Sequence, residues 1–382
     1  MSSKFCLNGS KLTLFRYPKL EGDKLQAWNA ADEYLLTELA PTLVGADRHN
    51  ILLVNDSFGA LACALNDHHC FSWSDSYISQ QASLSNLKIN GLNLDHFNGI
   101  KSTEMPPENI SMVLMKLPKS SLFLEYQLAT IQPLLSSQTI FNAAGMVKEI
   151  HSTTLKLFEK IIGPTTTSLA RKKARLIYVK ADLAHKRNNR IKSFEKNWAF
   201  DFYNKTLHIS NLANVFGRNQ LDAGAEILIN NLPREEVKQI IDLGCGNGVL
   251  GLAAACLHPQ ANVSFVDESF MATASAKKNV LNNFSDTMNR FQFFNDNCLD
   301  GFSKNSADLI LCNPPFHQQQ TITDHIAWQM MQDAHRVLKP GGRLLLVGNR
   351  HLNYHVKMKR IFGNQRVVDS NKNFVVLESR RS

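Results

Sequence analysis

Long apolar runs and cysteine pairs are both missing from this 382-residue sequence. Nowhere do about eighteen uncharged apolar residues follow one another, so no membrane-spanning helix is expected. The N-terminal segment has no apolar stretch followed by small residues, as an export signal would have. The seven cysteines form no C-x-x-C pair and no Cys/His spacing that suits zinc. We therefore expect a cytoplasmic protein with free thiols, no bound metal and no membrane contact.

Acidic residues are also in the minority, because 33 Asp and Glu stand against 42 Lys and Arg. The resulting net charge of +9 favours a polyanionic partner. The excess is concentrated in residues 171–196, which carry ten Lys and Arg and only two acids. This strip is either a solvated linker or a surface that follows a phosphate backbone. The candidate phosphate contacts are Arg171, Lys172, Lys173, Arg175, Lys186, Arg187 and Arg190.

Near-continuous apolar strands alternate with amphipathic helices from residue 236 onward. The strands read as "KQIIDL", "NVSFVD", "FQFFND", "ADLILC" and "RLLLVG", with helical patterns between most of them. This alternation predicts a parallel sheet covered on both faces, which is a doubly wound α/β domain. The closing segments "RVVDS" and "NFVVLES" predict an antiparallel pair at the sheet edge.

The same pattern occurs earlier, from residue 51, and suggests that a whole domain has been duplicated. Gly59 precedes Gly248 by 189 residues and Pro118 precedes Pro315 by 197, so the copies stay nearly in phase. The alternative is that any two α/β domains share such a rhythm. The first copy has "VNDSFG" and "KLPK" where the second has "DLGCGNG" and "NPPF". If the duplication is real, the first copy has kept its core and lost its site.

The fold class that follows is α/β, with two tandem Rossmann-like domains of which the first is a degenerate copy. The expected boundaries are residues 1–190 for the first domain, 191–205 for a basic linker and 206–382 for the second domain. We expect a monomer in which the first domain serves as a platform for the polyanionic partner.

A glycine-rich turn follows the first strand of the second domain, with Gly244, Gly246 and Gly248 at alternate positions. Glycines there allow a tight turn and let a ligand lie against the backbone. A dinucleotide fingerprint would need glycine at 249, but Val249 is there, and the D-x-G-x-G-x-G form is that of S-adenosylmethionine sites. Asp267, at the end of the next strand, could accept both ribose hydroxyls, or it could cap a helix. Asp242 is placed to orient the loop or to meet the amino end of the cofactor.

The turn "NPPF" ends the fourth strand beside the expected cofactor cleft. The lone pair of an exocyclic base amine is conjugated into the ring, which makes the amine a poor nucleophile. Two acceptors for its hydrogens, the side-chain carbonyl of Asn313 and the main-chain carbonyl of Pro314, would free that lone pair and stabilise the developing charge. Pro314 and Pro315 make the turn rigid, and Phe316 offers a face on which a ring can stack.

With these motifs in this order, residues 206–382 resemble the class I, Rossmann-like methyltransferases. "NPPF" with Phe resembles the guanine-N2 branch. The tandem arrangement, together with "VFGRNQLDAGAEILI", "FVDES" and "GPTTTSLARKKARL", resembles the bacterial ribosomal RNA guanine-N2 methyltransferases, and among them the large-subunit type more than its small-subunit paralogue. The resemblance covers nearly the whole chain.

The resemblance implies methyl transfer from S-adenosylmethionine to a guanine of 23S ribosomal RNA, and it implies roles for particular residues. The cofactor set is Asp242, Gly244, Cys245, Gly246, Asn247, Gly248, Asp267 and, for the adenine, Asn297 or Asp296. The base set is Asn313, Pro314, Pro315 and Phe316. His317, Arg218 and Asp222 either line the mouth of the cleft or are turn and surface residues.

Three other functions compete with this one. The substrate could be small-subunit rRNA, or it could be a protein glutamine side chain, since an NPP turn also suits a primary amide. Phe316 in place of Tyr and the basic strip argue against glutamine. A non-catalytic rRNA-binding assembly factor would agree with the first domain alone, but not with the intact site of the second.

Overall fold

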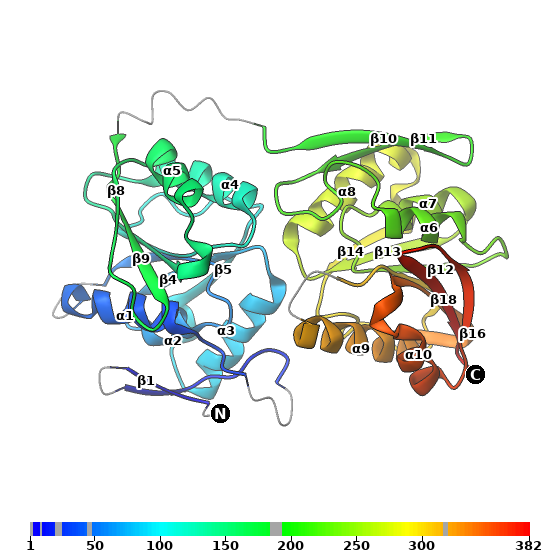
Figure 1. Cartoon of the computed structure of the whole chain (residues 1–382), viewed down its shortest axis with the longest axis horizontal. Helices are drawn as coiled ribbons and strands as arrows, with labels where there is room; N and C mark the ends of the chain where they lie inside the picture. Colours follow the sequence, from blue (N-terminus) through cyan, green and yellow to red (C-terminus); the bar gives the residue numbers. More distant parts are fainter. Residues whose placement is uncertain (1–2, 8–9, 20–24, 44–47, 184–192, 316–319) are drawn as a thin grey trace. The chain divides into compact units, whose positions relative to one another are not determined.

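The computed structural model describes residues 3–7, 10–19, 25–43, 48–183, 193–315 and 320–382. The chain divides into two compact units, Met1–Phe194 and Glu195–Ser382, which we name the N-domain and the C-domain. Each is an α/β domain with a seven-stranded sheet and helices against both faces (Figure 1). Within the described ranges, no helix is long and apolar enough to cross a membrane.

The N-domain sheet has five parallel strands followed by an antiparallel pair at one edge. Its strands, in spatial order, are β5 (Phe97–Lys101), β4 (His69–Ser74), β3 (Asn50–Val54), β6 (Met112–Lys116), β7 (Ile140–Met146), β9 (Ala174–Val179) and β8 (Thr165–Thr167). Its helices are α1 (Ala30–Leu43), α2 (Ala60–Ala64), α3 (Tyr77–Ile89), α4 (Ser121–Ile131) and α5 (Ser152–Ile161).

The C-domain sheet has the same arrangement of parallel and antiparallel neighbours. Its strands, in spatial order, are β14 (Phe291–Asn295), β13 (Asn262–Asp267), β12 (Gln239–Leu243), β15 (Ala307–Cys312), β16 (Leu338–Asn349), β18 (Phe374–Arg380) and β17 (Arg366–Ser370). Its helices are α6 (Ala223–Asn230), α7 (Val249–Leu257), α8 (Phe270–Phe284), α9 (Gln320–Val337) and α10 (Tyr354–Phe362).

Each domain also begins with a two-stranded antiparallel hairpin ahead of its sheet. In the N-domain β1 (Lys4–Leu7) pairs with β2 (Ser10–Thr13), and in the C-domain β10 (Lys196–Phe202) pairs with β11 (Lys205–Asn211). The predicted fold of two tandem Rossmann-like domains is confirmed. The repeat extends further than the sequence pattern indicated, because it includes the hairpins that lie before residue 51.

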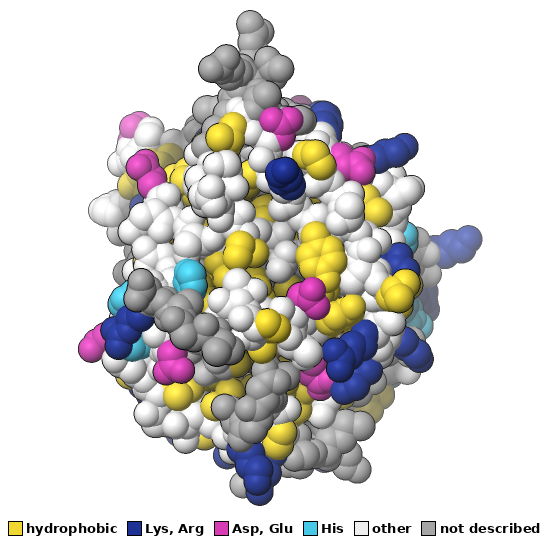
Figure 2. Space-filling model, turned by 90° about the vertical axis from the view of Figure 1, so that its left-hand side faces the viewer, with side chains coloured by type: hydrophobic (Ala, Val, Ile, Leu, Met, Phe, Trp, Pro, Cys, Tyr) yellow, Lys and Arg dark blue, Asp and Glu magenta, His cyan; other side chains and the backbone are white. Residues whose placement is uncertain are grey.

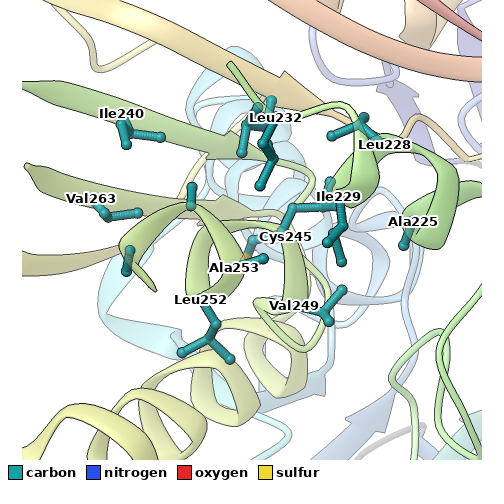
Figure 3. Close-up of a cluster of buried hydrophobic side chains, with 14 of the residues drawn as sticks. Ala225, Leu228, Ile229, Leu232, Ile240, Cys245, Val249, Leu252, Ala253 and Val263 are labelled. Carbon is teal, nitrogen blue, oxygen red and sulfur yellow. The ribbon is translucent and has the colours of Figure 1, made fainter. Parts of the chain in front are cut away.

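Apolar side chains from both faces of the C-domain strands form two layers of core. Figure 3 shows one layer, in which α6 and α7 pack against β12 and β13, with Leu228, Val249, Leu252 and Val263 among the buried side chains. Burial on both faces explains why these strands read as continuous apolar runs in the sequence. The core holds the carboxyl ends of β12 and β15 rigidly at one sheet edge.

Equivalent asparagines tie each hairpin to its domain. Asn279 on α8 accepts a hydrogen bond from the Ser210 amide at 2.7 Å and donates to the carbonyls of Ser210 and Asn247. Asn86 on α3, 193 residues earlier, makes the same three bonds with the corresponding groups of the N-domain. Such a shared polar network supports descent of both domains from one ancestral domain.

Residues 191–205, predicted as a linker, contain strand β10. The alternate residues Trp198, Phe200 and Phe202 pack against the C-domain core, which gives this strand its period of two. The compact C-domain therefore starts at Glu195, earlier than the predicted residue 206.

Candidate functional site

The glycine turn joins β12 to α7 with all three glycines in the left-handed region. Their φ angles are +71° for Gly244, +53° for Gly246 and +82° for Gly248, a conformation that other residues adopt only with strain. A Cβ on Gly248 would lie 3.0 Å from the Cβ of Ala276 on α8, whereas a Cβ on Gly246 would meet no heavy atom within 4 Å. Gly248 thus permits close helix packing, and Gly246 leaves its backbone open to a ligand.

Asp267, at the end of β13, reaches back to this turn. One carboxylate oxygen accepts a hydrogen bond from the Gly246 amide at 2.9 Å, and the other accepts one from the Ser269 amide at 3.0 Å. The side chain of Ser269 caps α8 through the Ala272 amide at 3.1 Å. The helix-capping role considered for Asp267 therefore belongs to Ser269, and Asp267 links the glycine turn to the next strand.

Asp242 lies beneath the turn and is fully buried. One of its oxygens accepts a hydrogen bond from the Gly251 amide of α7 at 2.8 Å, and the other has no partner among the described residues. Burial, together with a smaller effect of the nearby Asp267 carboxylate, raises the pKa of this carboxyl to about 8. The contact with Gly251 agrees with the loop-orienting role considered for Asp242.

The other predicted cofactor residues have internal partners. Asn247 donates to the side chain of Asn211 at 3.0 Å, and Cys245 is buried with its thiol against the Gly246 carbonyl. Both oxygens of Asp296 accept backbone amides, at 2.8 Å each. The side chain of Asn297 donates to Asp300 at 2.8 Å. Asp296 and Asn297 therefore stabilise the loop that follows β14. Strand β14 pairs with β13, which ends at Asp267.

The NPP turn lies beside the glycine turn because β12 and β15 are parallel neighbours. Leu243 pairs with Cys312, so Gly244 and Asn313 are the first residues beyond two adjacent strand ends. Pro314 is buried and Pro315 is exposed. Phe316 and His317, to which the sequence assigns stacking and cleft-lining roles, lie outside the described residues.

The amide of Asn313 is oriented by Asp222. Its nitrogen donates to a carboxylate oxygen of Asp222 at 3.2 Å, and the same oxygen caps α6 by accepting the Gly224 and Ala225 amides at 3.0 and 3.1 Å. The opposite amide orientation would place oxygen against a carboxylate, with no proton between them. The Oδ1 atom of Asn313 is buried and accepts no hydrogen bond from the described residues.

The N-domain fills the equivalent space with its own side chains. Strand register places Asn55 where the C-domain has Gly244, and Lys116 where it has Asn313. Asn55 keeps the left-handed backbone, with φ of +62°, but its side chain pairs with the amide of Gln127 and donates to the Lys116 carbonyl. The Lys116 ammonium forms a buried ion pair with Asp32 at 2.7 Å. The degenerate copy is thus closed by an amide pair and an ion pair.

The basic strip begins in the N-domain, passes through residues outside the described ranges and ends at Lys196, the first residue of β10. Arg171 bridges to Ala174 across a tight turn that joins β8 to β9. The first residues of the strip therefore belong to an N-domain hairpin. Lys172 in this turn forms an exposed ion pair with Glu33 at 2.7 Å, and the Arg171 guanidinium lies 5.9 Å from the Tyr34 ring centre. Lys186, Arg187 and Arg190 lie outside the described residues.

Two functional features escaped sequence reasoning. The contact of Asp222 with Asn313 joins residues 91 positions apart, and no local sequence pattern predicts it. Asn279 lies on a helix that reads as amphipathic, and only its correspondence with Asn86 could have singled it out. A residue-by-residue comparison of the two copies is the signal that could have found it.

A doubly wound sheet with this glycine turn and an adjacent NPP turn defines a class I methyltransferase. Residues 2–183 match the model of the RLMG N-terminal domain, and residues 206–378 match that of the methyltransferase small domain. The ribosomal RNA large subunit methyltransferase G of Aeromonas salmonicida is 48% identical over 375 residues, which are 97% of each chain. That of Erwinia tasmaniensis is 46% identical over 99% of each chain. The chain belongs to the family of ribosomal RNA large subunit methyltransferase G.

A solved structure shares the two-domain fold. The 16S rRNA N2 methyltransferase RsmC of T. thermophilus, in complex with AdoMet and guanosine, superposes with a TM-score of 0.76 over the whole of both chains. Its sequence is 18% identical, so the likeness concerns the fold.

The raised pKa of Asp242 predicts a pH dependence of stability. The folded pKa of about 8 exceeds the ordinary 3.8, so the folded C-domain binds more protons than the unfolded chain between these values. Stability due to this group is present below pH 3.8 and is lost as pH rises toward 8. The thermal midpoint of Asp242→Asn, relative to that of the wild type, should therefore increase as pH rises. Calorimetry between pH 5 and 9 measures this difference. The exposed Asp286→Asn is the matched control, and parallel profiles for wild type and Asp242→Asn would contradict the assignment.

Proposed function

We propose that this protein transfers a methyl group from S-adenosylmethionine to the exocyclic N2 amine of a guanine in 23S ribosomal RNA. The observation that carries the proposal is the buried Oδ1 of Asn313, which has no hydrogen-bond partner among the described residues and is fixed by Asp222 beside an open glycine turn. The large-subunit RNA is favoured by the names of the relatives, which are 43–48% identical over nearly the full length. The N2 position is favoured by the NPPF motif and by the name of the structural relative, a 16S rRNA N2 methyltransferase.

The C-domain residues fit a cofactor that lies against the backbone at the carboxyl edge of the sheet. S-adenosylmethionine, when bound, supplies an electrophilic methyl group. Gly244, Gly246 and Gly248 form the cradle, and Gly246 leaves open space where a side chain would project. We assign the ribose hydroxyls to Asp267, whose carboxylate already meets the Gly246 amide. Its negative charge suits a group with two hydroxyl donors.

The chemical role of the NPP turn is to accept hydrogen bonds from the target amine. Asn313 Oδ1 accepts one N–H and the Pro314 carbonyl accepts the other, which releases the amine lone pair from conjugation and stabilises the positive charge that develops. Asp222 prevents the Asn313 amide from turning its NH₂ group toward the amine. After transfer the surplus proton leaves to water, so no strong base is required.

The direct test uses RNA from a strain that lacks this protein. The purified protein is incubated with that RNA and labelled S-adenosylmethionine, and the labelled nucleoside is identified by mass spectrometry. N2-methylguanosine in 23S rRNA is the expected product. Label in 16S rRNA would favour the small-subunit alternative, and label only in ribosomal protein would favour the glutamine alternative.

Asn313→Ala should lower turnover by about 10² or more, the scale found for removal of one transition-state hydrogen-bond partner. Binding of S-adenosylmethionine should hardly change, because the glycine turn and Asp267 are untouched. Single-turnover methylation and cofactor titration measure the two effects separately. Wild-type turnover in this variant would remove Asn313 from the reaction.

Asp222→Ser should lower turnover by roughly tenfold or more, because serine can still cap α6 but is too short to hold the Asn313 amide. Asp222→Asn, which retains an acceptor oxygen, should recover much of the loss. The decisive measurement is a double-mutant cycle: Asp222→Ser should cost nothing further in an Asn313→Ala background. Equal losses in both backgrounds would leave Asp222 with the helix cap alone.

The N-domain, whose site is closed, is proposed to bind RNA and no cofactor. Arg171, Lys172 and Lys173 supply positive charge on an exposed hairpin turn. Figure 2 shows that on one face of the N-domain the Lys and Arg side chains are scattered in separate places, with apolar side chains between them. Such spacing favours a few separate phosphate contacts over one cationic patch.

Replacing Arg171, Lys172 and Lys173 together by Gln should weaken RNA binding and flatten its dependence on salt. Each lost phosphate contact lowers the slope of log affinity against log salt by roughly 0.7 to 0.9. Replacement of the exposed Lys148, Lys156 and Lys160 by Gln removes the same charge elsewhere on this domain and is the control. Identical salt slopes for the two triple variants would show that the turn is a solvated segment that makes no phosphate contact.

A further inference from the structure

The C-domain contains a second basic region that lies far from residues 171–196 in sequence. Residues 334–368 include eight Lys and Arg and no acid. Four of these cations are paired with carboxylates from elsewhere in the domain: Arg336, Lys339, Arg343 and Arg366. Arg350, Lys359 and Arg360 form no ion pair among the described residues. Their charge is available to a partner.

All three cations are exposed, on the segment that runs from the end of β16 through α10. Helix α10 buries Tyr354, Met358 and Phe362, and it turns Lys359 and Arg360 to solvent. Arg350 is exposed just after β16, whose carboxyl end lies at the same sheet edge as the NPP turn because β15 and β16 are parallel. The exposed surface of this segment therefore starts at the catalytic edge and follows α10 away from it.

An aromatic hollow adjoins this surface between α9 and α10, two helices that lie side by side in Figure 1. It has a volume of about 310 Å³ and is lined by Trp328, Gln332, His335, Arg360 and Ile361. The guanidinium of Arg360 lies 5.4 Å from the Trp328 ring centre. An indole face, a guanidinium and an amide side chain are the groups that hold unstacked nucleobases in single-stranded RNA.

We propose that the α9–α10 face is an RNA-binding surface of the C-domain, in which Arg350, Lys359 and Arg360 contact phosphates and Trp328 stacks an unpaired base. The inference rests on the proposed function for the class of partner. An acidic protein could satisfy the cations, but it would not need an aromatic face next to them. Arg350 follows β16 at the sheet edge that also holds the NPP turn, so RNA bound at Arg350 would extend toward that turn.

The charge test uses the full-length protein and a protein-free 23S rRNA transcript. Arg350→Gln, Lys359→Gln and Arg360→Gln together should lower the slope of log affinity against log salt by roughly 2 to 3. The control triple is Arg234→Gln, Lys238→Gln and Lys304→Gln, which removes the same charge from exposed residues outside this surface. Affinity for S-adenosylmethionine and the thermal midpoint should match in both. Equal slopes in the two triples would overturn the proposal.

The stacking test uses a short oligouridylate and the intrinsic fluorescence of Trp328. Trp328→Phe keeps a flat ring and should bind nearly as well as the wild type, whereas Trp328→Leu should bind on the order of tenfold more weakly. The quenching that oligouridylate causes in the wild type should diminish in both variants. Equal affinities for Phe and Leu, or equal binding of polyglutamate and oligouridylate by the wild type, would overturn the proposal.

Methylation of the same transcript by the wild type is measured in parallel, so the two proposals fail separately. A methylated transcript with equal salt slopes would refute the α9–α10 surface and leave the proposed function standing. Absence of methylation would refute the proposed substrate. If the salt slope of the variant with Arg350, Lys359 and Arg360 replaced still falls, the surface is supported.

Discussion

Parallel pairing of β12 with β15 is the constraint on which the site depends, because it brings two strand ends to the same sheet edge. Leu243 and Cys312 are partners in this pairing, so Gly244 and Asn313 emerge side by side. A shift of register by one residue would move one turn along the edge and exchange the two faces of its strand. The buried core around Val263 and Leu309 prevents such a shift, since both side chains are fully buried. The position of the chemistry is thus set by ordinary apolar packing.

The N-domain lacks the site of the C-domain but keeps the hydrogen bond that supports the helix after the turn. In the C-domain the carboxyl group of Asp242, at the strand end, accepts a hydrogen bond from the Gly251 amide of α7. In the N-domain Leu53 occupies that strand position, and Asp56 in the turn accepts the corresponding Ala62 amide at 2.9 Å. The helix after the turn is therefore bound by an aspartate in both domains. This aspartate lies on the strand in the C-domain and in the turn in the N-domain. Asn55 then fills the space that Gly244 leaves open.

The C-domain site also contains polar atoms that folding alone leaves unsatisfied. One oxygen of Asp242 and the Oδ1 of Asn313 are buried without partners among the described residues. Each such acceptor costs about 1 to 3 kcal/mol in a folded protein. Functional sites are the usual location for such departures from local rules. The Asp222 carboxylate accepts a hydrogen bond from the Asn313 nitrogen, and it thereby fixes the oxygen as the atom of the amide that stays unpaired.

The sequence by itself determined the fold class, the repeat of the domain and the two turns at the site, because apolar periodicity, glycine spacing and the NPP triplet are local signals. It did not determine where the C-domain begins, since β10 joins its core only through contacts made by alternate aromatic residues. Nor did it determine that Asp222 orients Asn313 or that Lys116 closes the first copy with Asp32. Those pairs lie 91 and 84 residues apart along the chain. Only the tertiary structure brings them within hydrogen-bonding distance, because the contact depends on how α6 and α1 pack against their sheets and not on any pattern within one segment.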